Sequence, residues 1–209
     1  MFNIIKSNRQ RLYLYLYLYL LLMEFAVKKY LLLCFLFFIN QPIFASPYQF
    51  NLQGHAGEVS DSDFKGQYIL LTFGFTSCPD ICPTVLYEIA QTLKLLEHPE
   101  KLQVIFVSID PNNDDLQRLQ QYVSYFDKRI LGLTADYESL KAMASAYGAT
   151  FGYKHQGQEV APPDLPLGYG VYHSSLTYLL SPERERLEVF TSQVKHKTMA
   201  QVIGKYLKQ

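Results

Sequence analysis

The feature that most constrains this chain is an apolar run that leads into two cysteines and then into a helical pattern. Residues 68–75, YILLTFGF, are almost continuously apolar, which is typical of a strand covered on both faces. Cys78 and Cys82 follow, each directly before a proline. Because a residue before proline disfavours the α region, the segment between them is predicted to be a turn. Pro83 suits the first helical position, so a helix is predicted from Pro83, with Cys82 near its N-cap.

This position has chemical consequences for the cysteines. Amide donors and the helix dipole at an N-terminus favour the thiolate form of Cys82. Thiolates bind soft metals and attack disulfides. The alternative is a structural disulfide or a pair of buried thiols, but so short a loop has little chain entropy to remove. The turn is therefore predicted to be a metal or redox site.

The apolar pattern predicts alternating strands and helices along the rest of the chain. Strands are expected at residues 50–52, 102–109, 129–133, 175–180 and 187–191. Helices are expected from Pro83 to about residue 97, from a cap at Asp114 or Asp115 to residue 126, from Asp136 to Gly148, and over residues 197–207. Residues 54–63 and the Gly- and Pro-rich residues 152–171 are predicted to be loops. This order predicts an α/β sandwich with the cysteine turn at the carboxyl end of a central strand.

The N-terminus is predicted to be a leader and not part of the fold. Residues 1–22 include a low-complexity Tyr-Leu alternation, and we interpret them as an over-long start. Residues 23–45 contain a basic segment, an apolar core at residues 30–39 and a small residue, Ala45, before Ser46, as in a signal peptide. An uncleaved signal anchor is the alternative. Cys34 lies in the apolar core and is interpreted as filler.

Residues 46–209 then form the predicted functional domain. The whole chain has 19 basic and 19 acidic residues; removing the 5 basic and 1 acidic residues of positions 1–45 leaves 14 and 18, a formal charge of −4. This balance argues against a nucleic-acid partner. Only Cys78 and Cys82 remain in this domain. An exported domain that keeps two thiols in one turn is expected to use them for chemistry.

Three patches together resemble the SCO/SenC family of copper-binding, thioredoxin-like proteins. They are residues 73–83 (FGFTSCPDICP), 107–111 (VSIDP) and 172–180 (YHSSLTYLL), and the resemblance covers about residues 50–207. It implies a thioredoxin-like three-layer sandwich with a central mixed sheet. It also implies that Cys78, Cys82 and His173 bind copper, as Cu(I) or Cu(II), for assembly of the copper centre of cytochrome c oxidase.

The resemblance also implies partners and a location. The partners would be the copper-accepting subunit of cytochrome c oxidase and other copper chaperones. The location would be exported, either periplasmic or anchored at the outer face of the inner membrane. A membrane tether is common in the family.

His173 is the candidate third ligand because it lies where a loop meets a strand, and two sulfurs with one imidazole accept copper. The remaining histidines are predicted to be solvated, with one of them, His155, as an alternative accessory ligand. The other three are His55, His98 and His196.

The sequence departs from the family pattern at two positions. Tyr172 stands where the family usually has Asp, and Ser77 stands where members often carry an aromatic residue or His. The Asp would orient or tune the metal site, and a Tyr172 hydroxyl could substitute for it. Asp80 is interpreted either as a partner contact or as a solvated turn acid. Turn chemistry alone explains Asp110.

Three function classes compete: a copper metallochaperone, a thiol–disulfide oxidoreductase, and a redox or copper sensor without turnover. Three features argue against a general oxidoreductase, so an enzyme is the less favoured reading. The cysteine spacing is Cys-x-x-x-Cys, the chain has no Trp, and no proline precedes residues 175–180. In the predicted mechanism the 152–171 loop flexes to admit a partner and copper passes by ligand exchange. Oxidation to a Cys78–Cys82 disulfide would release the metal.

Overall fold

The computed structural model describes residues 19–20, 23, 28–29 and 46–208. The predicted signal peptide and its cleavage site therefore lie largely outside the described residues. Residues 46–208 form one compact unit. Among the described residues, no helix is both long enough and apolar enough to cross a membrane.

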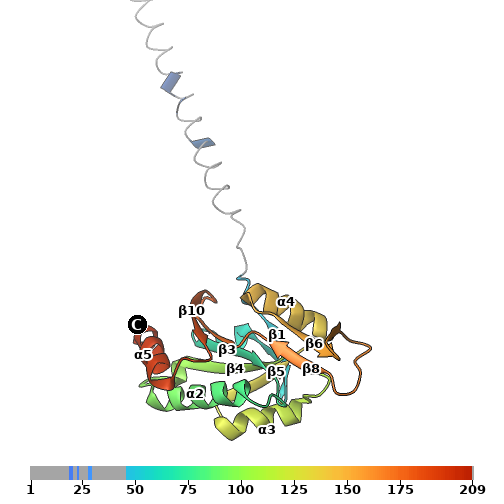
Figure 1. The fold of residues 1–209 in the computed structure, drawn as a ribbon. Helices are drawn as coiled ribbons and strands as arrows, with labels where there is room; N and C mark the ends of the chain where they lie inside the picture. The colour runs from blue at the N-terminus through green and yellow to red at the C-terminus, as the bar shows by residue number, and fades with distance from the viewer. Residues whose placement is uncertain (1–18, 21–22, 24–27, 30–45, 209) are drawn as a thin grey trace, which may run out of the picture. The chain divides into compact units, whose positions relative to one another are not determined.

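A seven-stranded mixed sheet forms the centre of this unit (Figure 1). Its order is β10-β9-β3-β4-β5-β1-β2. The strands are β1 (Asn51–Gly54), β2 (Gly57–Ser60), β3 (Tyr68–Gly74), β4 (Leu102–Ser108), β5 (Ile130–Thr134), β9 (Leu176–Leu180) and β10 (Arg186–Thr191). The central β3, β4 and β5 are parallel to one another, and the flanking strands pair antiparallel. This confirms the predicted mixed sheet.

Helices cover both faces of the sheet. The helices are α2 (Ile81–Leu95), α3 (Leu116–Phe126), α4 (Tyr137–Tyr147) and α5 (His196–Leu207). Since side chains alternate along a strand, Leu70 of β3 packs in the cluster that contains residues of α2, α3 and α5, whereas Ile69 and Leu71 pack in the cluster that contains residues of α4. The three layers form a thioredoxin-like α/β sandwich, as expected.

A second, smaller sheet corrects the prediction of a loop over residues 152–171. Its strands are β6 (Phe151–His155), β7 (Gln158–Val160) and β8 (Gly170–His173), in the order β7-β6-β8. Tyr172 of β8 lies over Gly152 of β6, where a Cβ in place of the glycine hydrogen would lie 2.5 Å from the Tyr172 hydroxyl. Such short strands depend on pairing and close packing more than on an apolar period, so the sequence pattern did not reveal them. The loop predicted at residues 54–63 is also wrong, because it contains β2 and a 3₁₀ helix, Asp61–Phe64.

The helix ends match the predictions except at α2, which begins at Ile81 and not at Pro83. Pro83 is the third residue of the helix, where the missing N–H has no intrahelical partner to lose. Asp115 caps α3 by accepting a hydrogen bond from the backbone of Arg118, at 2.8 Å. Asp136 caps α4, and Gly148 ends it with a φ of 70°.

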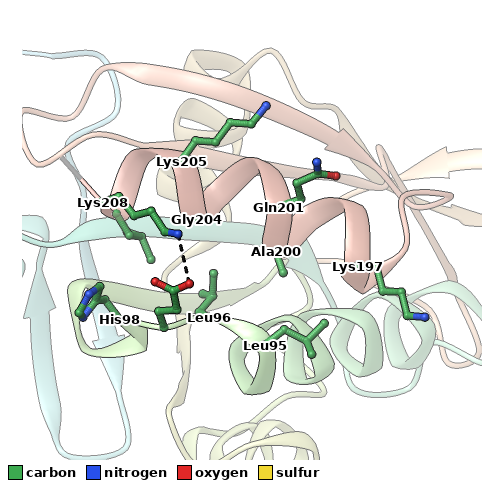
Figure 2. A pocket seen from close by; sticks show the side chains of 11 residues that line it. Leu95, Leu96, His98, Lys197, Ala200, Gln201, Gly204, Lys205 and Lys208 are labelled. Carbon is green, nitrogen blue, oxygen red and sulfur yellow. Dashed lines mark hydrogen bonds and ion pairs between the residues drawn. The ribbon is translucent and has the colours of Figure 1, made fainter.

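A groove of about 440 Å³ lies between the last turn of α2 and the outer face of α5 (Figure 2). It is lined by Leu95, Leu96, Glu97, His98, Lys197, Ala200, Gln201, Gly204, Lys205, Leu207 and Lys208. None of the three predicted metal ligands lines it. The cysteines belong to the other end of α2, so this groove is separate from the predicted site.

Candidate metal centre

The cysteine turn begins where β3 ends, at Gly74. A Cβ at Gly74 would lie 2.6 Å from Cε2 of Phe106 and 3.0 Å from Sγ of Cys82. Only a residue without a side chain allows the strand to pass so close to both groups. The backbone then turns, and the amide of Cys78 donates to the carbonyl of Phe75 at 3.3 Å. Gly74 thus allows Cys82 to pack directly against the end of the central strand.

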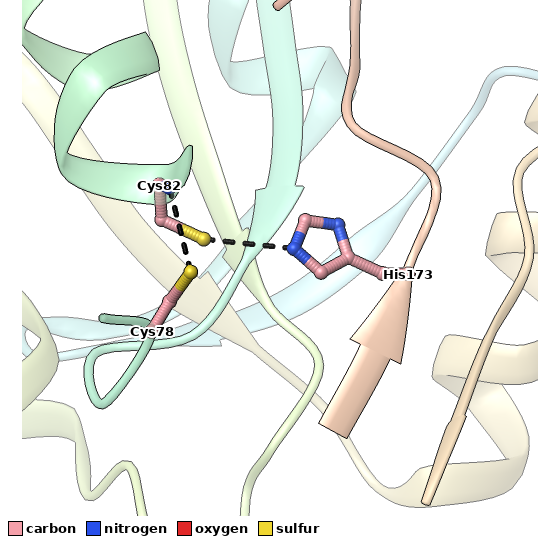
Figure 3. Close-up of side chains that lie close together, drawn as sticks. All are labelled: Cys78, Cys82 and His173. Atoms are coloured by element: carbon pink, nitrogen blue, oxygen red, sulfur yellow. Dashed lines mark hydrogen bonds between the residues drawn. The ribbon is translucent and has the colours of Figure 1, made fainter. Parts of the chain in front are cut away.

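The structure brings Cys78, Cys82 and His173 together (Figure 3). One ligand atom from each residue lies within 4.8 Å of the other two. Sγ of Cys82 and Nε2 of His173 are 3.6 Å apart. Cys78 comes from the turn, Cys82 from the first turn of α2, and His173 from the end of β8. Within the described part of the chain, this is the one group of this kind that could hold a metal ion.

Two neighbours orient the His173 ring. Nδ1 lies 3.0 Å from the carbonyl oxygen of Ser174, which can only accept a hydrogen bond. The proton is therefore on Nδ1, and the lone pair of Nε2 faces the sulfurs. The Phe75 ring packs edge-on against the imidazole, with centroids 6.0 Å apart. Burial lowers the pKa of His173, against a smaller opposing effect of the Ser174 carbonyl, which favours the neutral form that binds metals.

The protonation of Cys82 differs from the prediction. Its side chain is buried, with 3% exposure, and burial is the main reason that the pKa of its thiol is raised. The hydrogen bond with Cys78 and the charges of Cys78 and Asp114 act in the same direction. At the N-terminus of α2, where we expected amide donors to favour a Cys82 thiolate, the N–H of Cys82 donates to Sγ of Cys78 at 3.4 Å. A metal ion would therefore have to displace the Cys82 proton.

Access to the cluster is from the side of Cys78. Cys78 and His173 are only partly buried, whereas Cys82 is at the inner end of the cluster. A cavity of about 10 Å³ adjoins Cys82 and His173, with Phe106 and Thr72 in its wall. This is about the space that one water molecule needs. Cys78, the less buried of the two cysteines, thus offers a route for ligand exchange.

Asp114 is a part of this centre that the sequence did not reveal. Its carboxylate is 1% exposed and accepts hydrogen bonds from the backbone and hydroxyl of Thr76, at 2.9 and 2.5 Å, and from the hydroxyl of Ser108, at 2.6 Å. Thr76 is two residues before Cys78, so Asp114 ties the cysteine turn to the end of β4. The sequence offered Asp114 and Asp115 equally as caps of α3, and nothing in it linked either to Thr76.

The other histidines lie outside the cluster. His155 is on β6, paired with Gln158, and does not join the three ligands. His55 is exposed, and His98 is exposed and pairs with Glu100 at 3.2 Å. The prediction for His196 is wrong: it is partly buried, and its Nδ1 lies 2.6 Å from the buried carboxylate of Glu88.

The two departures from the family pattern have local partners. The hydroxyl of Tyr172 donates to Glu159 at 3.0 Å, and its ring lies under the amine of Lys154, so it does not supply a hydroxyl to the metal centre. Ser77 accepts a hydrogen bond from Arg118 at 3.0 Å.

Two further acids were singled out in the sequence. Asp80 is exposed at the start of α2, where its side chain makes no capping hydrogen bond. Asp110 is buried and does more than shape a turn, because it accepts hydrogen bonds from the hydroxyl of Tyr169, at 2.5 Å, and from Asn113, at 3.0 Å. It therefore attaches the segment before β8 to the end of β4.

Known proteins of one family are similar to most of this chain. The SCO1/SenC family matches residues 41–208, which is more than half of the chain. Protein sco1 of Schizosaccharomyces pombe is 33% identical over 154 residues, covering 73% of this chain and 57% of that protein. The chain spans about half of the length of the curated relatives that it matches.

Solved structures of similar fold include copper-bound proteins. The structure of Arabidopsis thaliana ScoI with copper bound has a TM-score of 0.67 and 27% identity, and the match covers 77% of this chain and 97% of that one. The structure of yeast Sco1 with copper bound has a TM-score of 0.65 and 30% identity, with 77% and 87% covered.

Proposed function

The chain belongs to the SCO1/SenC family, and from that premise we propose that it is a copper metallochaperone. In this proposal it binds one copper ion through Cys78, Cys82 and His173. The observation that supports it is the cluster itself, in which three ligand atoms from separate segments lie within 4.8 Å of one another. Three of the solved structures that the chain resembles contain copper.

The donor set also favours copper over zinc. Two thiolates and one imidazole suit Cu(I), and they accept Cu(II) as well. Structural zinc sites almost always have four protein ligands, and the described residues offer three here. The neutral Nε2 of His173 and the polarisable sulfurs are the ligand atoms. Binding releases the protons of the two thiols.

Copper transfer would proceed by ligand exchange on the exposed side of the centre. A ligand of the acceptor protein would first replace Cys78, whose sulfur is the more accessible of the two. Cys82 and His173 would hold the ion until the acceptor completes its own ligand set. Protons then return to the thiols as the copper leaves.

We further propose the biological setting that the family implies. The acceptor would be the copper-accepting subunit of cytochrome c oxidase, and other copper chaperones would supply the ion. The protein would be exported, as a periplasmic protein or one anchored at the outer face of the inner membrane. The support is the leader pattern at residues 23–45 and the use of both remaining cysteines in one turn.

A thiol–disulfide oxidoreductase is the second candidate. The observation in its favour is that both cysteines are free and their sulfurs lie within 4.8 Å of each other. A disulfide between them would then consume the copper ligands. A redox or copper sensor would use the same switch without turnover.

The test is transfer of Cu(I) from the loaded protein to the acceptor subunit, followed anaerobically. The double variant Cys78→Ser/Cys82→Ser should neither load nor transfer. His155→Ala changes a histidine outside the cluster and should transfer like the wild type. Transfer that survives the double substitution would refute the chaperone mechanism. Weak copper binding together with rapid disulfide exchange would favour the oxidoreductase.

A further inference from the structure

Asp114 is a buried carboxylate without a cation. It is 1% exposed, and within the described residues it forms no ion pair. Arg118, one turn along α3, donates instead to Ser77. The hydrogen-bond donors to this carboxylate are all neutral, and a charge in such a medium of low dielectric constant acts on its surroundings more strongly than one in water.

The charge of Asp114 acts on the metal centre. Asp114 accepts hydrogen bonds from Thr76, which precedes Cys78 by two residues, and from Ser108. Ser108 pairs with Gly74, where a Cβ would lie 3.0 Å from Sγ of Cys82, so the carboxylate lies behind both cysteines. Asp110, the other buried acid at this end of β4, bonds to Tyr169 and Asn113 and not to the cysteine turn. The hydroxyl of Tyr122, also buried, makes no hydrogen bond to either acid. The cation on this side of the centre is Arg118, which donates to Ser77 and is exposed, so solvent screens its charge more strongly than that of the buried Asp114.

The two copper oxidation states respond differently to a nearby negative charge. Two thiolates and a neutral imidazole give the Cu(I) complex one excess negative charge and leave the Cu(II) complex neutral. A fixed carboxylate repels the negatively charged Cu(I) complex and does not repel the neutral Cu(II) complex. It thus raises the affinity of the site for Cu(II) relative to Cu(I).

We propose that Asp114 is a positioning residue whose buried charge sets the preference of the centre between Cu(I) and Cu(II), in favour of Cu(II). This inference rests on the proposed function, because it needs copper at Cys78, Cys82 and His173. It assigns a role to a residue that binds no metal. Asp114 also accepts hydrogen bonds from Thr76, and mutation can separate their effect from the effect of the charge.

The test compares three variants of the full chain in the copper-loaded form. Asp114→Asn removes the charge but keeps the size. Its amide oxygen, in the place of Oδ2, can accept from the Thr76 amide and the Ser108 hydroxyl, and the Thr76 hydroxyl can turn to accept from its amide nitrogen. Asp115→Asn is the matched control, because it makes the same charge change one residue away on an exposed cap that Asn also forms. Thr76→Val removes one hydrogen bond to Asp114 and keeps the charge.

The measurement is the potential of the copper couple, followed by the thiolate-to-Cu(II) absorption band. Asp114→Asn should raise the Cu(I)-to-Cu(II) affinity ratio by about tenfold, which raises the potential of this one-electron couple by about 59 mV. Asp115→Asn and Thr76→Val should each stay within about twofold of the wild type. An unchanged potential in Asp114→Asn would overturn the proposal, and so would an equal shift in Thr76→Val.

A further variant protects the test against misfolding. Asp114→Glu keeps the charge at the site while disturbing the hydrogen bonds, and its copper potential should remain near that of the wild type. A shift as large as about tenfold in this variant would overturn the proposal, because charge would not be the controlling factor. Wild-type protein that binds no copper would refute the proposed function instead, so the two failures are distinguishable.

Discussion

At the scale of single residues, the centre is oriented before any metal arrives. The carbonyl of Ser174 holds the proton of His173 on Nδ1, and burial keeps the ring neutral. The sulfur of Cys78 accepts a hydrogen bond from the backbone N–H of Cys82. Because these groups are fixed by the fold, copper binding requires loss of thiol protons but little rearrangement of the ligands.

His173→Ala should weaken copper binding by about a hundredfold or more, since even the loss of groups that only support a ligand costs 10- to 100-fold. A competitive titration against a chromophoric Cu(I) chelator, with the protein reduced, measures the effect. His155→Ala is the control, because His155 is a partly buried histidine of the same small sheet that lies outside the cluster. Equal affinities in the two variants would show that His173 is not a ligand.

At the scale of helices and strands, the sequence predicted the main sheet and the helices around it. Continuous apolar runs identify β3 and β4, and the caps at Asp115 and Asp136 mark the starts of α3 and α4. The small sheet was missed because its strands are short and interrupted by glycine. Its core residues, Phe151 and Tyr153, are separated by Gly152 and followed by the polar Lys154 and His155, so the segment has no apolar run like that of β3 or β4.

The site could be predicted in part. Cys78 and Cys82 follow from the turn between two prolines, whereas His173 depended on the family resemblance, since a lone histidine gives no spatial information. Asp114 could not be predicted, because its contact with Thr76 spans 38 residues and arises only when β3 and β4 lie side by side. The prediction that Cys82 favours the thiolate form was also wrong, because the sequence did not reveal that its side chain is buried.

Gly74→Ala should destabilise the fold and disturb the centre. The added Cβ would meet the Phe106 ring at 2.6 Å and Sγ of Cys82 at 3.0 Å, and overpacking of this kind costs about 1–3 kcal/mol. Gly204→Ala is the matched control, because the new Cβ has no neighbour within 4 Å and lies inside α5. That change should stabilise by about 0.4–1 kcal/mol. Urea unfolding measures both, and a neutral Gly74→Ala would contradict the close packing of strand and cysteine.

The pairing of α2 with α5 should make stability depend on pH through Glu88. Burial alone would raise the pKa of this carboxyl, but hydrogen bonds from the backbone and ring of His196 and from Lys195 lower it. A lowered folded-state pKa stabilises the protein above the ordinary Glu pKa of about 4.3. This contribution is lost as the pH falls through the lower, folded-state value.

Glu88→Gln should therefore lower the free energy of unfolding by about 1–3 kcal/mol at neutral pH, because it leaves buried donors poorly paired. The difference from the wild type should shrink as the pH falls below about 4. Urea unfolding across this range measures it. A difference that persists unchanged in acid would show that shape, and not charge, makes the contribution.

At the scale of the whole molecule, we expect the mature protein to begin at Ser46. The apolar core at residues 30–39 and Ala45 form the cleavage pattern of a signal peptide, and the domain that follows carries a formal charge of −4. Intact-mass measurement of protein purified from its native source tests this. A mass that retains residues 23–45 would favour the anchor, and one that includes Met1 would show that residues 1–22 are not an over-long start.

The central claim is that Cys78, Cys82 and His173 together hold one copper ion. X-ray absorption spectroscopy at the copper edge, on reduced protein loaded with one equivalent of Cu(I), tests it most directly. The predicted spectrum contains two sulfur ligands and one imidazole, and the imidazole signal disappears in His173→Ala. A spectrum with no sulfur ligands, or one in which the imidazole signal survives in His173→Ala, would contradict the claim.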